Sequence, residues 1–448
     1  MAPDRWGTRQ YTRRGVLQAA AGAGLVLAAG RLPRLAAAPS PGVGVGVGVR
    51  PNPRLPEGVD TIPQIEHLVV LMMENHSYDN YLGLLGRGDG LKVDAKGRPT
   101  ATNLDASGRP IRAFHMPSTC QLHGEPDNSW TPTHVSMNGT RNDGFARGSG
   151  PVAMGYYTPE DIPFYAGLAR TFVLADRWFT SVPGKTFPNR YCLLAGTPNG
   201  LVVNTLPAQD PVNGSVMDVL DAHGISWLDY YSTTPSTDLF KSVIRSDQSK
   251  QVPIARLFTD AAAGTLPFFS LVEPDFGKSS EEDPQDIRVG EQFAAQVIDA
   301  VMHGPGWAKT MLVWCYDESG GYYDHVPPPA APVPDSIPPN IHVPPDAPGG
   351  YDRYGFRVPA VVVSPFARKG HVSSVVYDHT SVLRFIETKW NLPALSNRDG
   401  HAANLLDCLD LHGHPAFLTP PKLPTPSLTV NSAPCAPISP SSIPPATP

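Results

Sequence analysis

The chain has 448 residues, of which 41% are hydrophobic and 17% charged, so it is expected to be mostly globular and long enough for one large domain. Its formal net charge of −6 argues against nucleic acid as a partner, because phosphate backbones bind basic surfaces. The 51 prolines exceed an ordinary share and gather before residue 63, in 327–350 and in 416–448. Those three stretches are expected to be linker, loop and tail.

Residues 1–38 have the features of an export signal. Arg13-Arg14 precedes an uncharged apolar run from Gly15 to Gly30, and small alanines follow for cleavage. The paired arginines resemble a twin-arginine signal, which implies the twin-arginine export machinery as a partner and a secreted or cell-envelope location. A membrane anchor is the alternative, but about 16 weakly apolar residues are short for a span. Because the segment holds six arginines and one aspartate, its removal takes the net charge from −6 to −11.

The segment 39–62, with its Gly-Val alternation at 42–49, is expected to be a flexible linker, and the main domain is expected to span 63–415. Continuous apolar runs predict buried strands. These runs lie at 67–73, 268–272, 310–316 and 358–363. Apolar residues at a period near 3.6 predict helices at 286–303 and 380–390. This alternation indicates an α/β fold with a mostly parallel sheet and helices on both faces.

Polar side chains follow two of these strands directly. Glu74 and Asn75 come after the first, and Asp317 and Glu318 come after the third. In open α/β sheets the site lies beyond the carboxyl ends of the strands, so we expect these groups to converge. Each pair alone could simply cap a turn, but two pairs of oxygen ligands favour one divalent metal ion, whose identity the ligands leave open.

The segment Ser181–Tyr191 contains two prolines and a glycine and is expected to be a rigid turn that leads into a helix from Asn189. Thr186 in this turn could coordinate the metal and attack phosphorus, because a metal lowers the pKa of a bound hydroxyl. Lys185 or Arg190 could hold the phosphate near the helix N-terminus. The alternative is an ordinary surface turn.

The chain has an odd number of cysteines, so at least one must stay unpaired in an oxidising compartment. Cys408 and Cys435 flank the proline-rich tail, and we expect them to pair because a bridge there would tether it. Cys315 lies in an apolar strand and is expected to be a buried thiol.

The string 70–83, VLMMENHSYDNYLG, resembles the opening signature of the bacterial phosphoesterase family, which includes phosphatidylcholine-hydrolysing phospholipases C and acid phosphatases. Blocks at 176–190, 316–328 and 354–381 match the family in the same order, so the resemblance covers about residues 65 to 400. The resemblance implies an alkaline-phosphatase-like core in the segment 63–415.

The resemblance also implies roles for individual residues. The metal would be held by Glu74, Asn75, Thr186, Asp317 and Glu318. Thr186 would attack phosphorus, and water would hydrolyse the resulting phosphothreonine. Asn189, Lys185, Asn128 and Asp283 are expected to lie at the substrate, with Arg190 as a catalytic phosphate contact.

The chain departs from the family at three positions where histidine is common, and it carries Asn128, Asp283 and Ser319 there. The candidates for phosphate contact or general acid are therefore His134, His325 and His379. His325 could instead be a structural residue of a turn, and His379 could cap the following helix. Asp283 could itself bind metal or donate a proton if burial raised its pKa.

These features predict an exported, metal-dependent phospholipase C acting on phospholipid phosphodiesters. An acid phosphatase for small phosphate esters is the alternative, because the extra C-terminal β domains of larger family phospholipases are missing. A non-catalytic protein that binds phosphate or lipid head groups is a third possibility. Peripheral membrane contact could involve the aromatics of 156–165, although core packing explains such aromatics more often.

Overall fold

The computed structural model describes residues 46–120, 126–342 and 345–428. The predicted export signal at 1–38 and the first residues of the predicted linker lie outside the described residues. Within them, no helix is both long and apolar enough to cross a membrane.

The described chain contains one large sheet and two small ones. The strands are β1 (His67–Met73), β2 (Thr102–Leu104), β3 (Pro110–Arg112), β4 (Phe114–His115), β5 (Gly155–Tyr156), β6 (Val173–Ala175), β7 (Trp227–Tyr231), β8 (Gln251–Pro253), β9 (Phe269–Glu273), β10 (Thr310–Tyr316), β11 (Ala360–Val363) and β12 (Val372–Ser373). The helices are α1 (Tyr78–Leu82), α2 (Trp130–Met137), α3 (Phe145–Gly148), α4 (Pro163–Thr171), α5 (Thr186–Ala195), α6 (Val216–Ala222), α7 (Lys241–Ser246), α8 (Ala255–Ala263), α9 (Ile287–His303), α10 (Thr380–Trp390) and α11 (Asn397–His401).

The large sheet has eight strands in the order β12-β6-β11-β10-β1-β9-β7-β8. β1 pairs in parallel with β10 and β9, and β7 pairs in parallel with β9 and β8. Only β11 runs against its neighbours, β10 and β6. The loop 317–359 returns to the edge where β10 ends, so the next strand starts there and runs backwards. The mostly parallel sheet is confirmed, and the start of β11, not its end, faces the candidate site.

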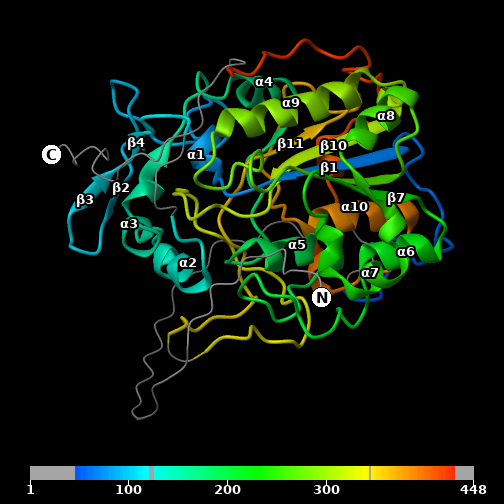
Figure 1. Ribbon diagram of the computed structural model, residues 1–448, viewed down its shortest axis with the longest axis horizontal. Coiled ribbons are helices and arrows are strands. Elements are labelled where there is room, and N and C mark those ends of the chain that lie inside the picture. The colour runs from blue at the N-terminus through cyan, green and yellow to red at the C-terminus, as the bar shows by residue number, and fades with distance from the viewer. Residues whose placement is uncertain (1–45, 121–125, 343–344, 429–448) are drawn as a thin grey trace. The chain divides into compact units, whose positions relative to one another are not determined.

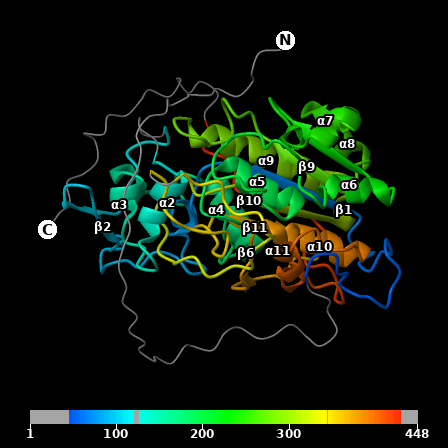
Figure 2. The same ribbon diagram turned by 90° about the horizontal axis from the view of Figure 1, so that it is seen from below.

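Helices cover both faces of the sheet, as predicted. α4, α8 and α9 lie on one face, and α5, α6 and α10 lie on the other (Figures 1 and 2). β1 and β10 form the centre of the core because their continuous apolar runs can be buried on both sides. α9 begins after Asp286, whose side chain accepts the Arg288 backbone N–H, and it buries its apolar stripe.

The predicted linker is fixed to the body where it is described. The Gly48 backbone N–H donates to the Ala394 carbonyl at 2.7 Å, and the Thr61 N–H donates to the Lys389 carbonyl at 2.6 Å. The Asn391 side chain also binds the backbone around Asn52. The expectation of a flexible linker is therefore wrong for residues 46–62, because α10 and the segment after it supply partners for its backbone groups.

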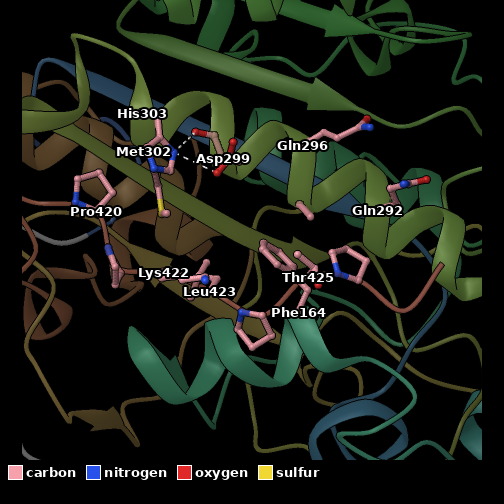
Figure 3. A pocket seen from close by; sticks show the side chains of 14 residues that line it. Phe164, Gln292, Gln296, Asp299, Met302, His303, Pro420, Lys422, Leu423 and Thr425 are labelled. Carbon is pink, nitrogen blue, oxygen red and sulfur yellow. Dashed lines mark hydrogen bonds and ion pairs between the residues drawn. The ribbon is translucent and has the colours of Figure 1, made fainter. Parts of the chain in front are cut away.

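The described part of the proline-rich tail packs against two helices. Residues 420–426 run beside α4 and α9 and, together with them, enclose a pocket (Figure 3). A side chain on Gly167 of α4 would lie 2.3 Å from Cδ of Pro424, so this glycine allows the close approach. Proline-rich composition here marks an extended segment that packs on a surface.

Two predictions about side chains in the core have opposite outcomes. Cys315 is a buried thiol, as expected. The predicted pairing of Cys408 is wrong, because Cys408 is a free buried thiol beside the Tyr377 hydroxyl, whereas Cys120 is disulfide-bonded.

The aromatics Tyr157 and Tyr165 are fully buried, so core packing explains them rather than lipid contact.

Candidate active site

The carboxyl ends of β1 and β10 bring the two predicted acidic pairs together. These strands pair with Met73 opposite Tyr316, and the Asp317 backbone N–H donates to the Met73 carbonyl at 3.0 Å. The side chains that follow, Glu74, Asn75, Asp317 and Glu318, are all buried. Convergence at this edge is therefore confirmed.

The turn before α5 places Thr186 at the first position of the helix, with Lys185 as its N-cap residue. The Asn189 side chain holds this turn. Its Oδ1 accepts the Val182 N–H at 3.1 Å, and its amide donates to the carbonyls of Val182, Gly184 and Lys185 at 3.0 to 3.3 Å. Both the oxygen and the NH2 group of the Asn189 side chain thus bond the backbone. Its predicted role at the substrate is replaced by one in shaping the turn, and α5 begins at Thr186 rather than Asn189.

Thr186 and Asn75 line a small cavity of about 40 Å³, which has room for an ion or a few waters. The lining consists of Asn75, Pro126, Asn128, Lys185, Thr186, Asn204, Glu282, Asp283 and Gly320. The structure therefore brings together five residues that the sequence predicted for the site: Asn75, Asn128, Lys185, Thr186 and Asp283.

Asn128 connects the two acidic strand ends. Its amide donates to Oδ1 of Asn75 at 3.2 Å and to Oε1 of Glu318 at 2.5 Å. The other oxygen of Glu318 accepts the Gly320 N–H at 2.7 Å. Gly320 has a φ of +63°, and a Cβ there would lie 2.0 Å from the Asn75 carbonyl oxygen, so no other residue fits. The site is therefore closely packed around Asn128 and Gly320.

Arg190 lies one turn of α5 beyond Thr186 and points into the acidic cluster. Its guanidinium contacts Glu273 at 2.6 Å, Asp317 at 3.2 Å and Glu74 at 3.8 Å. These bonds make it an internal counter-ion rather than part of the cavity wall. Arg190, which was expected to contact phosphate, therefore points into the acid cluster instead of the cavity. Lys185 is the cation that lines the cavity.

The acid cluster, defined here as Glu74, Glu273, Asp317 and Glu318, has too little positive charge around it. Burial raises the pKa of Glu74 well above its usual value, and repulsion by Asp317 raises it further. Burial and Asp317 likewise raise the pKa of Glu318, and burial raises that of Asp317 to about 6 although Arg190 opposes this. The Arg190 guanidinium therefore pairs with three carboxylates, and an oxygen of Glu273 and Nη2 of Arg190 are buried without a hydrogen-bond partner.

A divalent cation fits this chemistry. Glu74, Asn75, Asp317, Glu318 and the Thr186 hydroxyl offer oxygen donors only, which hard cations prefer. The added charge would offset the repulsion that the pKa shifts express. These residues are the ones that would hold the ion.

The tightest group of potential ligands in the described residues is a different one. Ligand atoms of Asp79, Asp324 and His325 lie within 4.8 Å of one another, so this group could hold a metal. The predicted acids do not form such a tight group, because Arg190 binds Glu74 and Asp317 while Asn128 and Gly320 hold Glu318.

Arg357 already provides positive charge to this second group. It donates to Asp324 at 2.9 Å and to Asp79 at 3.2 Å. His325 donates to Asp79 through its backbone N–H and bonds it again through Nδ1, both at 2.7 Å. Although burial lowers it, the bond and charge of Asp79 raise the pKa of His325 to about 9. We call Asp79, Asp324, His325 and Arg357 the clasp, and Nε2 of His325 also bonds the exposed Asp89 at 3.2 Å.

The structure places the three candidate histidines away from the cavity lining that it describes. Nδ1 of His134 bonds the Trp130 carbonyl at 2.7 Å, and its ring packs on that of Trp130. Nε2 of His379 bonds the Tyr316 carbonyl at 2.9 Å, and burial lowers its pKa to about 4. His325 belongs to the clasp, which agrees with the structural alternative for it. His379 occupies the N-cap position of α10, but its side chain makes no capping bond.

Sequence reasoning missed several residues of this region. Glu282 neighbours the predicted Asp283, and Gly320 lies in a Ser-Gly-Gly turn, so both had local signals. Asn204 reaches the site from a distant loop that no short motif indicates, whereas Glu273 directly follows the predicted strand 268–272 and so had the same strand-end signal as Glu74. Asn204 accepts the Phe187 N–H at 2.9 Å and so holds the first turn of α5.

An α/β fold that gathers a threonine hydroxyl, a lysine and buried carboxylates at one sheet edge has the groups that a hydrolase site requires. Comparisons with known proteins give the family. The model of the phosphoesterase family matches residues 65–393. The chain belongs to the phosphoesterase family and is a hydrolase of phosphoric esters related to phospholipases C.

Similar proteins include non-specific phospholipase C1 of Arabidopsis thaliana, which is 31% identical over 82% of this chain and 75% of its own length. Phospholipase C A of Mycobacterium tuberculosis is 30% identical over 82% of this chain and 80% of its own. A solved protein of the alkaline phosphatase superfamily from Vibrio parahaemolyticus is 10% identical, with a TM-score of 0.41 over 82% of this chain and 73% of its own.

Proposed function

We propose that this protein is an exported, metal-dependent phospholipase C that cleaves phospholipid phosphodiesters through a phosphothreonine. The observation that carries this proposal is the position of Thr186, which lines the cavity at the start of α5 beside Lys185 and shares that lining with Asn128, whose amide bonds Glu318 of the acid cluster. The relatives named phospholipase C support a diester substrate.

In this proposal the Thr186 oxygen attacks phosphorus, the bond to the glycerol oxygen breaks, and the Thr186 proton is released. A bound divalent ion would lower the pKa of the hydroxyl and offset negative charge on the phosphate. Lys185 holds the non-bridging phosphate oxygens, and the N-terminus of α5 favours the same charge. Water then attacks the phosphothreonine, releases the phosphorylated head group and regenerates the hydroxyl.

The departing alkoxide needs a proton, and we assign this role to Asp283 in its protonated form, which gives its proton to the alkoxide and regains one from the water that attacks the phosphothreonine. It lines the cavity in the place where the family carries histidine, and its carboxyl oxygens lie 3.0 and 3.1 Å from the Tyr322 hydroxyl. An Asp283→Asn variant should lose much of its kcat for substrates with poor leaving groups and less for nitrophenyl esters, whose leaving group needs no proton. Equal losses on both would contradict the assignment.

Export rests on the sequence of 1–38, and the disulfide at Cys120 agrees with an oxidising compartment. Expression of the full chain in a host with a twin-arginine pathway should yield a mature protein that begins near residue 39. Retention of residues 1–38 in a cytoplasmic product would contradict export.

The activity is tested with p-nitrophenylphosphorylcholine, p-nitrophenyl phosphate and phosphatidylcholine vesicles, on the wild type and on Thr186→Ala. The proposal expects diester turnover by the wild type and none by the variant. Turnover of the monoester alone would make the protein a phosphatase, and turnover of neither with tight ligand binding would make it a binding protein. Activity retained in Thr186→Ala would overturn the mechanism.

A further inference from the structure

The segment 199–214, which we call the rim loop, presents apolar side chains to solvent. Val203, Leu206 and Val212 are 45%, 50% and 90% exposed. Single exposed apolar residues are common on protein surfaces, so exposure alone says little. The anchoring, position and charge of the rim loop set it apart.

The rim loop is held firmly at its base. Both oxygens of Asp210 accept backbone N–H groups at the start of α7, from Lys241 and Ser242, each at 2.8 Å. The Asn199 amide donates to the Gln209 carbonyl at 2.9 Å, and the Asn213 amide donates to the Leu395 carbonyl at 2.6 Å. These bonds keep the apolar side chains outward and prevent them from folding back onto the core.

The rim loop also reaches the cavity. Asn204 lines the cavity and bonds the first turn of α5, so its neighbour in the chain, the exposed Val203, lies one residue from the cavity wall. At its start the loop meets the proline-rich segment, because the Asn340 N–H donates to the Gly200 carbonyl at 2.9 Å. The two segments run side by side below α5 (Figure 1). An apolar rim therefore continues into the wall that holds Thr186.

The charge of the rim loop suits a surface without net charge. Asp210 is its only charged residue, and that carboxylate is used by α7. The protein as a whole carries a net charge of −6, which opposes binding to anionic lipids. The surface that fits is therefore zwitterionic, and its attraction comes from apolar burial.

We propose that the rim loop is the contact with a zwitterionic phospholipid surface, where Val203, Leu206 and Val212 enter the lipid and place the cavity mouth at the level of the head groups. This inference rests on the proposed function, since it names the surface from which that activity takes its substrate. The rim loop takes the place of the aromatics of 156–165, of which Tyr157, Phe164 and Tyr165 are buried, as the lipid contact.

The test measures how much protein sediments with phosphatidylcholine vesicles. It compares the variant Leu206→Ser/Val212→Ser with a matched control, Val93→Ser/Leu104→Ser. The control residues lie outside the rim loop and are 47% and 51% exposed. Loss of one exposed Leu and one Val from the contact should weaken vesicle binding about tenfold. The control should bind like the wild type. Binding should change little between low and high salt.

Hydrolysis is measured in parallel. The rim-loop variant should lose turnover of phosphatidylcholine vesicles but keep that of p-nitrophenylphosphorylcholine. If the wild type hydrolysed neither substrate, the proposed function would be wrong. Vesicle binding is measured without hydrolysis and so tests the rim loop alone. Equal vesicle binding by both variants would overturn the inference, as would a switch from dimer to monomer in the rim-loop variant, which would assign the surface to a second copy.

Discussion

Two clusters of buried charge lie at the same edge of the sheet and differ in how they are balanced. In the clasp, Arg357 pairs with both Asp79 and Asp324, and His325 pairs with Asp79 and with the exposed Asp89. In the acid cluster, Arg190 pairs with three carboxylates, Glu74, Glu273 and Asp317, while Glu318 is held by the neutral groups of Asn128 and Gly320. Balanced buried ions serve structure, whereas a deficit of positive charge beside a cavity indicates a place for a cation.

The largest expected effect comes from removing the hydroxyl beside the acid cluster. Thr186→Ala should lower kcat for p-nitrophenylphosphorylcholine by about 10³-fold or more, because no nucleophile replaces it. Its thermal unfolding should match the wild type, since the side chain lies at a cavity wall. A Thr186→Ser control should retain measurable activity, and equal loss in both variants would argue for a packing defect.

Removing the cation of the clasp should affect stability instead. Arg357→Met leaves Asp79 and Asp324 buried without it, and the free energy of unfolding should fall by about 3 to 5 kcal/mol. Arg109→Met, which breaks an exposed pair with Asp105, should change the free energy of unfolding far less, because solvent screens that pair. Urea unfolding of both variants measures the difference. Similar values would show that the clasp is not a structural ion network.

A smaller effect is expected for the residue that orients the proposed ligands. Asn128→Ala removes the amide that bonds Asn75 and Glu318, and kcat/KM should fall about 10- to 100-fold. Asn404→Ala, which removes a bond to Thr388, serves as the control and should leave kinetics unchanged. Unchanged kinetics in Asn128→Ala would remove it from the site.

The smallest effect is a pH dependence of stability. The pKa of His325 rises from 6.5 to about 9 on folding, so its contribution is complete below pH 6.5 and is lost as pH rises through 9. His325→Gln should therefore be less stable than the wild type by about 1 to 3 kcal/mol at pH 6. This gap should shrink towards pH 10. A gap independent of pH would mean that the imidazole acts by packing alone.

The sequence predicted the centre of the fold well, because long apolar runs and helical periods are local signals. β10 and α10 have the predicted bounds. The reversed direction of β11 was not predictable in this way, since it depends on the path of a 43-residue connection without regular period.

The residues of the candidate site that directly follow a strand were predictable from the sequence. Glu74 and Asp317 converge because the parallel pairing of β1 with β10 is implied by the two apolar runs. The partners of Arg190 and Asn189 were not predictable, because tertiary packing decides whether a polar side chain faces substrate or its own backbone. His134 and His379 show the same limit, since burial turns each toward a main-chain carbonyl.

The central claim is that the acid cluster, and not the clasp, holds the metal, and the metal content of two isosteric variants tests it most directly. Elemental analysis of the purified wild type should find one divalent ion per chain. Asp317→Asn, checked for folding by circular dichroism, should lose this ion, whereas Asp324→Asn should keep it. Loss of the ion in Asp324→Asn with retention in Asp317→Asn would contradict the account.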